Sequence, residues 1–306
     1  MSFIYARNLK NKIYVFSDSK LSISPEDKDR LIKTIGKENY NNVMSLGVIK
    51  NVIINKNICV ASAGILEDFN KLLEMIDNNK LFKIEEICLE ALKIHCDKNG
   101  RTDFIVALSD TTDSKLYEIK NGSIEEVQTS WLGIYECFKN FQRLKEIEKE
   151  NSRLSDSDIE QLKKEYACFN RTFNPEQSFE SIAFQKTVNS NIDNSVGGYV
   201  VECIGECGIF QYNELFSTHV EKEQIVLPGN NVKIHDSVFD GGYSYHVYQS
   251  NNNYKMYILQ LGKGIIYEPN INDRSYNHLR MPNIYNMSES EFINKAEINE
   301  ISVSLV

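Results

Sequence analysis

Blocks of short apolar runs alternate with blocks of helical pattern along this sequence, and that order restricts the possible fold more than any other feature. Apolar runs typical of strands come first, at residues 3–7, 13–16, 48–53 and 58–64. Two stretches with helical spacing of apolar residues follow, at 67–78 and 84–95. Strands are predicted next at 104–108, 116–119 and 124–127, then helices over 134–169 and 176–192, then strands at 198–204 and 208–211. Such an order predicts an α+β fold in which two sheets lie between helical layers.

Two further segments add to this order. A helix is predicted near 24–36, because Ser24 occupies a cap position, Pro25 the first helical position and Asp27 the third position after the cap. After about residue 215 the chain is rich in β-branched and aromatic residues, with turn signals such as 228–231. We therefore divide the chain into a domain of residues 1–215 and a β-rich extension of residues 216–306.

Composition excludes several classes of function. The 306 residues include 42% hydrophobic and 25% charged residues, which is the balance of a globular protein. The net charge of −9 argues against a nucleic-acid partner bound through phosphate neutralisation and against an anionic membrane surface. No apolar run is long enough to span a bilayer, and no basic segment precedes an apolar one at the start. Seven scattered cysteines are typical of reduced thiols, so we expect a cytoplasmic protein.

Common motifs for nucleotide, zinc-protease and serine-hydrolase chemistry are absent, and the weaker candidates favour structural roles. Cys203 and Cys207 have a zinc-like gap but no second ligand pair, so we expect no metal site. His95 lies on the apolar face of a predicted helix and is interpreted as a core histidine. Residues 262–264 read as a turn rather than a phosphate loop. No cofactor is predicted.

The informative residues lie near the N-terminus. Ser2 becomes the first residue once Met1 is removed, and a small second residue permits that cleavage. Asp18 follows Ser2 by 16 positions, directly after the second predicted strand. Lys50 begins the next strand pattern and precedes Gly64 by 14 positions, and a helix starts directly after that glycine.

These spacings resemble those of proteasome β subunits and their bacterial proteasome-like peptidase relatives, the N-terminal-nucleophile hydrolases. The resemblance covers residues 2–215 and implies a four-layer α-β-β-α sandwich. Residues 193–198, Asp-Asn-Ser-Val-Gly-Gly, are similar to the family's Asp-x-x-Ser-Gly-Gly, before the same kind of strand pair. Lys50 follows Asp18 by 32 positions, twice the family spacing, so the resemblance implies an insertion at residues 21–49.

The resemblance implies a role for each matching residue, and those roles are chemically coherent. Ser2 is the expected nucleophile, and its own α-amine, with a pKa of about 7.7–8.0, is the expected base. A buried Lys50 ammonium lowers the pKa of both groups, and Asp18 keeps that lysine charged and oriented. The Gly64 N–H donates to the oxyanion, and Asp193 holds the terminal amine.

The same resemblance suggests the substrate and the partners. Lys20 and Ser62 are the expected substrate-binding residues, and the small side chain of Ser62 leaves room for a large substrate residue. The inserted segment at 21–49 is expected near the substrate channel, because Asp18 and Lys50 fix its two ends beside the site. We expect a peptide or protein substrate, a homo-oligomeric ring and an ATPase partner.

Three positions depart from the family pattern and keep other functions open. The nucleophile is serine rather than the usual threonine, Val196 stands where the family has serine, and residues 130–133 replace a Ser-Gly-Ser sequence. One alternative is a catalytically inactive proteasome-like subunit that acts as a scaffold or binding module. Another is a hydrolase of small-molecule amides with the same fold.

Overall fold

The computed structural model describes most of the chain between residues 2 and 296. The described ranges are 2–23, 47–79, 81, 83–97, 99–151, 175–190, 192–213, 215–218, 244–248, 254–258, 262–267 and 282–296, with pieces at 28–29, 31–33, 36–37, 40–41, 44, 157, 160 and 164. The predicted helix start at 24–27, most of the predicted helical region 134–169 beyond residue 151 and the predicted turn at 228–231 lie outside them.

The chain has a mixed α+β fold with antiparallel sheets. Sheet A has the strand order β10-β9-β2-β1-β8. Its strands are β1 (Phe3–Asn8), β2 (Lys12–Asp18), β8 (Thr129–Gly133), β9 (Val200–Glu206) and β10 (Ile209–Tyr212). The β1–β2 hairpin pairs Ile4 with Ser17, which places the start of β1 beside the end of β2. β9 then pairs with β2, with Val200 opposite Asp18.

Sheet B follows the chain in simple order, β3-β4-β5-β6-β7. Its strands are β3 (Asn51–Asn55), β4 (Ile58–Ala63), β5 (Asp103–Leu108), β6 (Lys115–Lys120) and β7 (Ser123–Glu126). A tight turn at Asn121 and Gly122 joins β6 to β7, which correspond to the predicted strands at 116–119 and 124–127. Each neighbouring pair in the sheet is antiparallel.

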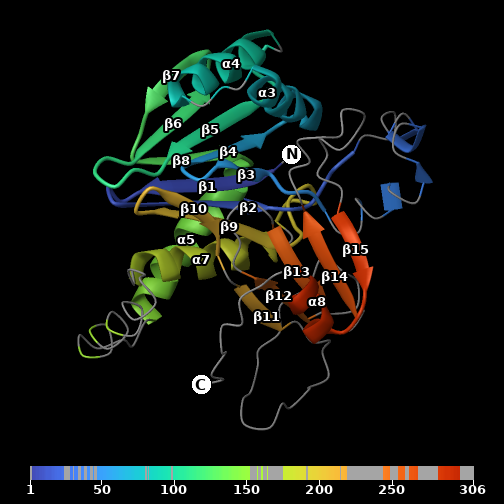
Figure 1. Ribbon diagram of the computed structural model, residues 1–306. Coiled ribbons are helices and arrows are strands. Elements are labelled where there is room, and N and C mark those ends of the chain that lie inside the picture. Colours follow the sequence, from blue (N-terminus) through green and yellow to red (C-terminus); the bar gives the residue numbers. More distant parts are fainter. Residues whose placement is uncertain are drawn as a thin grey trace.

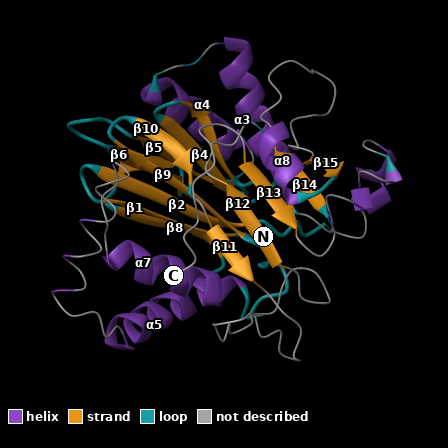
Figure 2. Cartoon of the chain, turned by 60° about the horizontal axis from the view of Figure 1, so that its bottom comes forward, coloured by secondary structure: helices purple, strands orange, loops and turns teal. Residues whose placement is uncertain are grey.

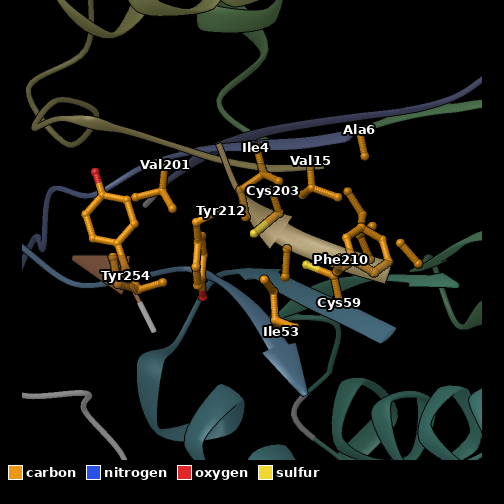
Figure 3. Close-up of a cluster of buried hydrophobic side chains, with 14 of the residues drawn as sticks. Ile4, Ala6, Val15, Ile53, Cys59, Val201, Cys203, Phe210, Tyr212 and Tyr254 are labelled. Atoms are coloured by element: carbon orange, nitrogen blue, oxygen red, sulfur yellow. The ribbon is translucent and has the colours of Figure 1, made fainter. Parts of the chain in front are cut away.

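Sheets A and B pack face to face through one buried apolar cluster. Figure 3 shows side chains of β1, β2 and β9 facing those of β3 and β4, with Phe210 and Tyr212 of β10 between them. The members drawn from the two sheets include Ile4, Ala6, Val15, Val201 and Cys203 on one side and Ile53 and Cys59 on the other. Close contact between these faces holds the ends of the two sheets together, and the predicted site residues lie at those ends.

Two helix pairs cover the outer faces of the sheets (Figures 1 and 2). The first pair, α3 (Leu66–Asn79) and α4 (Ile84–Asp97), packs on sheet B through residues such as Phe69, Leu72 and Ile87. The second pair, α5 (Tyr135–Asn151) and α7 (Pro175–Val188), packs on sheet A through Phe141 and Phe184. Phe3 of β1 stacks on Phe184 with ring centroids 4.8 Å apart.

A third antiparallel sheet, sheet C, is built from the end of the chain in the order β11-β12-β13-β14-β15. Its elements are β11 (Leu215–Thr218), β12 (Ser244–Tyr248), β13 (Tyr254–Ile258), β14 (Lys263–Tyr267), β15 (Pro282–Asn286) and the short helix α8 (Glu289–Lys295). Tyr254 and Tyr267 belong to the same buried cluster that joins sheets A and B. The predicted β-rich extension therefore shares its core with the first part of the chain, and Figure 1 shows it beside the ends of sheets A and B.

Most strand and helix predictions agree with the structure within a few residues. The prediction for residues 48–53 is displaced, because β3 begins only at Asn51. Strand β8 was not predicted: its five residues alternate exposed or half-buried positions with buried Ser130 and Leu132, since β8 is the edge strand of sheet A. In the described part of the chain, no helix is long and apolar enough to cross a membrane.

Candidate active site

The β1–β2 hairpin places Ser2 beside Asp18. The main-chain N–H of Phe3 donates to Asp18 Oδ1 at 2.8 Å, so the carboxylate lies next to the residue that follows Ser2. The carbonyl of Ser2 accepts from the Ile134 N–H at 3.2 Å. A side chain at Gly133 would bring its Cβ to within 1.7 Å of that carbonyl, so only glycine allows β8 to approach the chain start so closely.

Lys50 and Asp18 form a buried ion pair between the two sheets. Lys50 Nζ lies 2.8 Å from Asp18 Oδ2, and the two side chains are 6% and 0% exposed. Burial raises the pKa of Asp18 above its ordinary value, while Lys50 and the N–H groups of Phe3 and Gly197 oppose that rise. Burial lowers the pKa of Lys50, which Asp18 opposes and the positive charge of Lys20 reinforces. Lys50 therefore loses its proton more readily than an exposed lysine does.

Ser62 and Gly64 lie at the neighbouring end of β4. The Ser62 N–H donates to the Lys50 carbonyl at 3.1 Å, which joins this strand end to the ion pair. Gly64 has φ +142°, and a Cβ there would lie 2.4 Å from the Arg101 carbonyl oxygen, so another residue would collide with the backbone. The following N–H, of Ile65, donates to Thr102 Oγ1 at 3.0 Å. These contacts fix the turn that leads from Gly64 into α3.

The segment before β9 closes the site from the other side. The Gly197 carbonyl accepts from the N–H groups of Ser19 and Lys20 at 3.2 and 3.0 Å, and the Gly197 N–H donates to Asp18 Oδ2 at 3.4 Å. The Lys20 side chain lies against Gly197. Hydrogen bonds from Ser195 lower the pKa of Asp193, and the chain's amino terminus and Lys20 lower it further.

All seven predicted site residues thus lie at one end of sheets A and B, but their direct contacts differ. Asp18 and Lys50 contact each other, and Ser62 contacts Lys50 through the main chain. Asp193 accepts hydrogen bonds from Ser195, which is not a predicted site residue. Within the described part of the chain, it has no hydrogen bond to the other six predicted site residues. Among the same described residues, no hydrogen bond joins the Ser2 hydroxyl to Lys50. Ser2 is 5% exposed, so the expected nucleophile is buried beside the ion pair.

Two polar residues of the site were missed from the sequence. Asn51, the first residue of β3, accepts from the Ser17 hydroxyl at 3.0 Å, and both are fully buried. Thr102 donates to Asp68 Oδ2 at 2.7 Å and so completes the hydrogen bonding of the Gly64 turn. Asn51 carried one usable signal, because asparagine is a poor strand former and here stands inside an apolar run.

The weaker sequence candidates have structural roles or lie apart from the site. His95 is confirmed as a buried histidine with both ring nitrogens hydrogen-bonded: Nδ1 bonds to the Thr102 carbonyl at 2.9 Å, and Nε2 accepts from the Gly122 N–H at 3.0 Å. Cys203 is buried in β9, whereas Cys207 is exposed in the following turn. Of the turn predicted at 262–264, only Gly262 lies in a turn, because β14 begins at Lys263. Within the described residues, no group of three His, Cys, Asp or Glu side chains could hold a metal ion.

The sequence matches no protein-family model, and no curated protein matches it.

Proposed function

We propose that this protein is a proteasome-like peptidase in which Ser2, exposed as the N-terminal residue by removal of Met1, is the nucleophile. One observation carries the proposal. A single buried carboxylate, Asp18, accepts from the Phe3 N–H at 2.8 Å and from Lys50 Nζ at 2.8 Å, so a lysine and the residue after Ser2 converge on one group. A hydroxyl nucleophile needs an adjacent base, which the α-amine of Ser2 supplies here, and a lowered pKa, which a nearby buried lysine charge favours.

The packing of the elements supports the same proposal. The buried clusters follow the order α3 and α4, sheet B, sheet A, then α5 and α7. That order is the one expected for the four-layer α-β-β-α sandwich of N-terminal-nucleophile hydrolases. Sheet C is an addition to it, and we assign sheet C no catalytic role.

The proposed reaction has two steps. Ser2 Oγ attacks the carbonyl carbon of an amide, its proton passes to the Ser2 α-amine, and the C–N bond breaks as the leaving amine takes a proton. The resulting ester on Ser2 is then hydrolysed by water, which releases the acid and restores the hydroxyl. The amine can act as a base near neutral pH because its ordinary pKa is about 7.7–8.0.

The neighbouring residues have distinct proposed roles. Lys50 stabilises negative charge on the hydroxyl oxygen and lowers the pKa of the amine through its positive charge. Asp18 orients Lys50, and the Gly64 N–H donates to the oxyanion, a contribution of about 3 kcal/mol for one donor. Asp193 holds the terminal amine that removal of Met1 creates on Ser2.

The surroundings of the site support the proposed substrate region. Val48 N–H donates to the Ser19 carbonyl at 2.8 Å, so the two ends of the inserted segment meet beside Asp18. Leu21, Leu31 and Tyr40 pack against Val48, as does Leu66 at the start of α3. We propose that this segment, with Lys20 and Ser62, borders the bound peptide, and that the protein acts in the cytoplasm as a homo-oligomeric ring that an ATPase supplies.

The experiment combines intact-mass measurement with a β-lactone probe. We expect a mass that lacks Met1 and a single covalent adduct on Ser2, with peptide hydrolysis lost in Ser2→Ala and retained in Ser123→Ala, which changes a serine in the distant β6–β7 hairpin. Hydrolysis by a protein that fully retains Met1 would exclude the amine as base. Sedimentation that shows only monomers at micromolar concentration would exclude the ring.

A second candidate is a catalytically inactive subunit that serves as a scaffold or binding module. Val196, which occupies the position of the family's serine, is 2% exposed and packs in the apolar cluster under α5 and α7. It therefore supplies no hydroxyl to the terminal amine. An intact N-terminal Ser2 that no β-lactone modifies would favour this candidate.

A further inference from the structure

Asn51 is a fully buried polar residue that ties sheet B to sheet A. Its Oδ1 accepts from the Ser17 hydroxyl at 3.0 Å. Its Nδ2 donates to the carbonyl oxygens of Val15 at 2.9 Å and Val201 at 3.0 Å. Since Ser17 and Val15 lie in β2 and Val201 lies in β9, one side chain of β3 contacts two strands of the opposite sheet.

These hydrogen bonds leave the Asn51 amide little freedom. Both N–H groups of Nδ2 have partners and Oδ1 has a donor, so rotation of the amide would place like groups against each other. The main-chain carbonyl of the same residue accepts from the Tyr212 hydroxyl at 3.1 Å. In Figure 3 the Tyr212 side chain lies between the two sheets, close to Val201 and Cys203. A buried network whose groups are all paired fixes one arrangement of the surrounding strands.

The network runs parallel to the ion pair of the proposed site. Ser17 directly precedes Asp18, and Asn51 directly follows Lys50. The bond between Ser17 and Asn51 and the bond between Asp18 and Lys50 therefore join the same two strand ends, one residue apart. A displacement that moves this end of β3 away from β2 therefore lengthens both bonds.

We propose that Asn51 is a positioning residue that holds Lys50 in contact with Asp18 and therefore beside Ser2. The expected effect of Asn51 on reaction rate rests on the proposed function. Its effect on the position of Lys50 does not. Truncation of Asn51 removes three hydrogen bonds, those to the Val15 and Val201 carbonyls and that from the Ser17 hydroxyl, and opens space between the sheets. Water that enters this space solvates those groups and also reaches Lys50.

The first test follows Lys50 directly and needs no catalysis. Protein labelled with ¹³C at lysine Cε is titrated by NMR, and the Lys50 signal is assigned by its absence in Lys50→Arg. We expect Lys50 to titrate below the surface lysines in the unchanged protein. In Asn51→Ala we expect its midpoint to rise by about one pH unit, because water at the ammonium removes the effect of burial, which is larger than the opposing effect of Asp18 that a longer distance weakens. An unchanged Lys50 midpoint in folded Asn51→Ala would overturn the proposal. If that variant fails to fold, Ser17→Ala, which removes only one bond, provides the same comparison with a smaller shift, and no shift there would equally overturn it.

The second test follows the rate and pH dependence of β-lactone addition to Ser2. We expect Asn51→Ala to react at least about tenfold more slowly, with its rate midpoint at higher pH, because an amine farther from a positive charge has a higher pKa. The matched control is Tyr14→Phe, which removes a buried hydrogen bond on the opposite face of sheet A and should change neither rate nor midpoint. Equal slowing in both variants would show a purely structural role and overturn the proposal. If Ser2 of the unchanged protein does not react at all, the proposed function fails, and the Lys50 titration still decides the role of Asn51.

Discussion

Asp18 and Glu180 are both fully buried carboxylates that face cations, yet their surroundings differ. The Glu180 carboxylate of α7 accepts hydrogen bonds from the Tyr5 hydroxyl at 3.0 Å, from Arg7 Nη1 at 2.7 Å and from the Tyr14 hydroxyl. It also forms an ion pair with Lys145 Nζ at 3.7 Å. These groups come from β1, β2 and α5, so the Glu180 cluster fastens the helix pair to the outer face of sheet A.

The Asp18–Lys50 pair has fewer partners and a different place in the fold. Asp18 accepts from one lysine and two main-chain N–H groups. Among the described residues, only one of the three N–H donors of Lys50 has a partner. A buried ammonium with unused donors can stabilise a charge that develops beside it, whereas the groups around Glu180 are already directed at that carboxylate. The comparison therefore supports the proposed chemical role of the Asp18–Lys50 pair and a structural role for the Glu180 cluster.

The largest expected effect comes from the loss of the Lys50 charge. Lys50→Met keeps most of the side-chain volume, and we expect β-lactone addition and peptide hydrolysis to fall by about 10²–10⁴ because an electrostatic and proton-transfer contribution is lost. Lys145→Met is the matched control, since Lys145 also faces a buried carboxylate, and its rates should stay within about twofold of the unchanged protein. Equal losses in the two variants would remove the distinction between the regions.

Removal of Glu180 should affect stability instead of rate. Glu180→Ala leaves Arg7 and two tyrosine hydroxyls without their acceptor, and we expect the free energy of unfolding to fall by about 3 kcal/mol. That value lies at the low end for a broken buried pair because the Arg7 side chain is 25% exposed and can turn toward water. Urea unfolding measures the loss, and β-lactone addition at a temperature where the variant is folded should be unchanged. A large rate loss in the folded variant would contradict the structural role.

The sequence predicts the class of fold because that depends on local pattern, whereas the pairing of Asp18 with Lys50 was implied by the resemblance to N-terminal-nucleophile hydrolases. Apolar runs such as those at β2 and β4 mark their strands, and the spacing of Asp18, Lys50 and Gly64 marks the strand ends. Strand β8 was missed because an edge strand beside the chain start has no continuous apolar run, although Gly133 is the residue that allows its close approach to Ser2.

Long-range polar pairing could not be predicted from the sequence. Glu180 lies 175 positions from Tyr5 and 166 from Tyr14, and nothing local shows that the two hydroxyls meet one carboxylate. Asn51 was visible only as a polar residue in an apolar run, and its three side-chain hydrogen bonds depend on how the two sheets face each other. Such pairings follow from tertiary packing rather than from propensity.

A smaller effect is expected when Asp18 keeps its shape but loses its charge. In Asp18→Asn the amide retains one oxygen acceptor, so either Lys50 or the Phe3 N–H loses its partner. We expect β-lactone addition to slow about tenfold, the equivalent of one charge-assisted hydrogen bond of about 1.5 kcal/mol. The rate loss should be smaller than that in Lys50→Met, because the lysine charge remains. A greater loss in Asp18→Asn would mean that Asp18 itself takes part in proton transfer.

The smallest expected effect is on the pH dependence of the free energy of unfolding, which has opposite signs for the Glu180 cluster and the Asp18–Lys50 pair. Burial, and then the charge of Glu180, raise the pKa of Tyr14 above its ordinary value of 10.0. The folded protein therefore keeps a proton that the unfolded chain releases, so the stabilising contribution of Tyr14 is complete below about pH 10 and is lost at higher pH, by about 1.4 kcal/mol per pH unit. Lys50 has the opposite sign, because its lowered pKa makes the unfolded chain the better proton binder below 10.5, and its contribution to stability rises with pH.

Urea unfolding between about pH 9 and 11 measures this difference. The free energy of unfolding should decline less steeply with pH in Tyr14→Phe and more steeply in Lys50→Met than in the unchanged protein. Tyr135→Phe, at a side chain that is 58% exposed, should follow the unchanged protein, because its hydroxyl contacts water in both states. If the free energy of unfolding declines equally steeply with pH in Tyr14→Phe and in the unchanged protein, the Tyr14 hydroxyl ionises equally in the folded and unfolded protein. The proposed contrast between the buried Glu180 cluster and the Asp18–Lys50 pair would then fail.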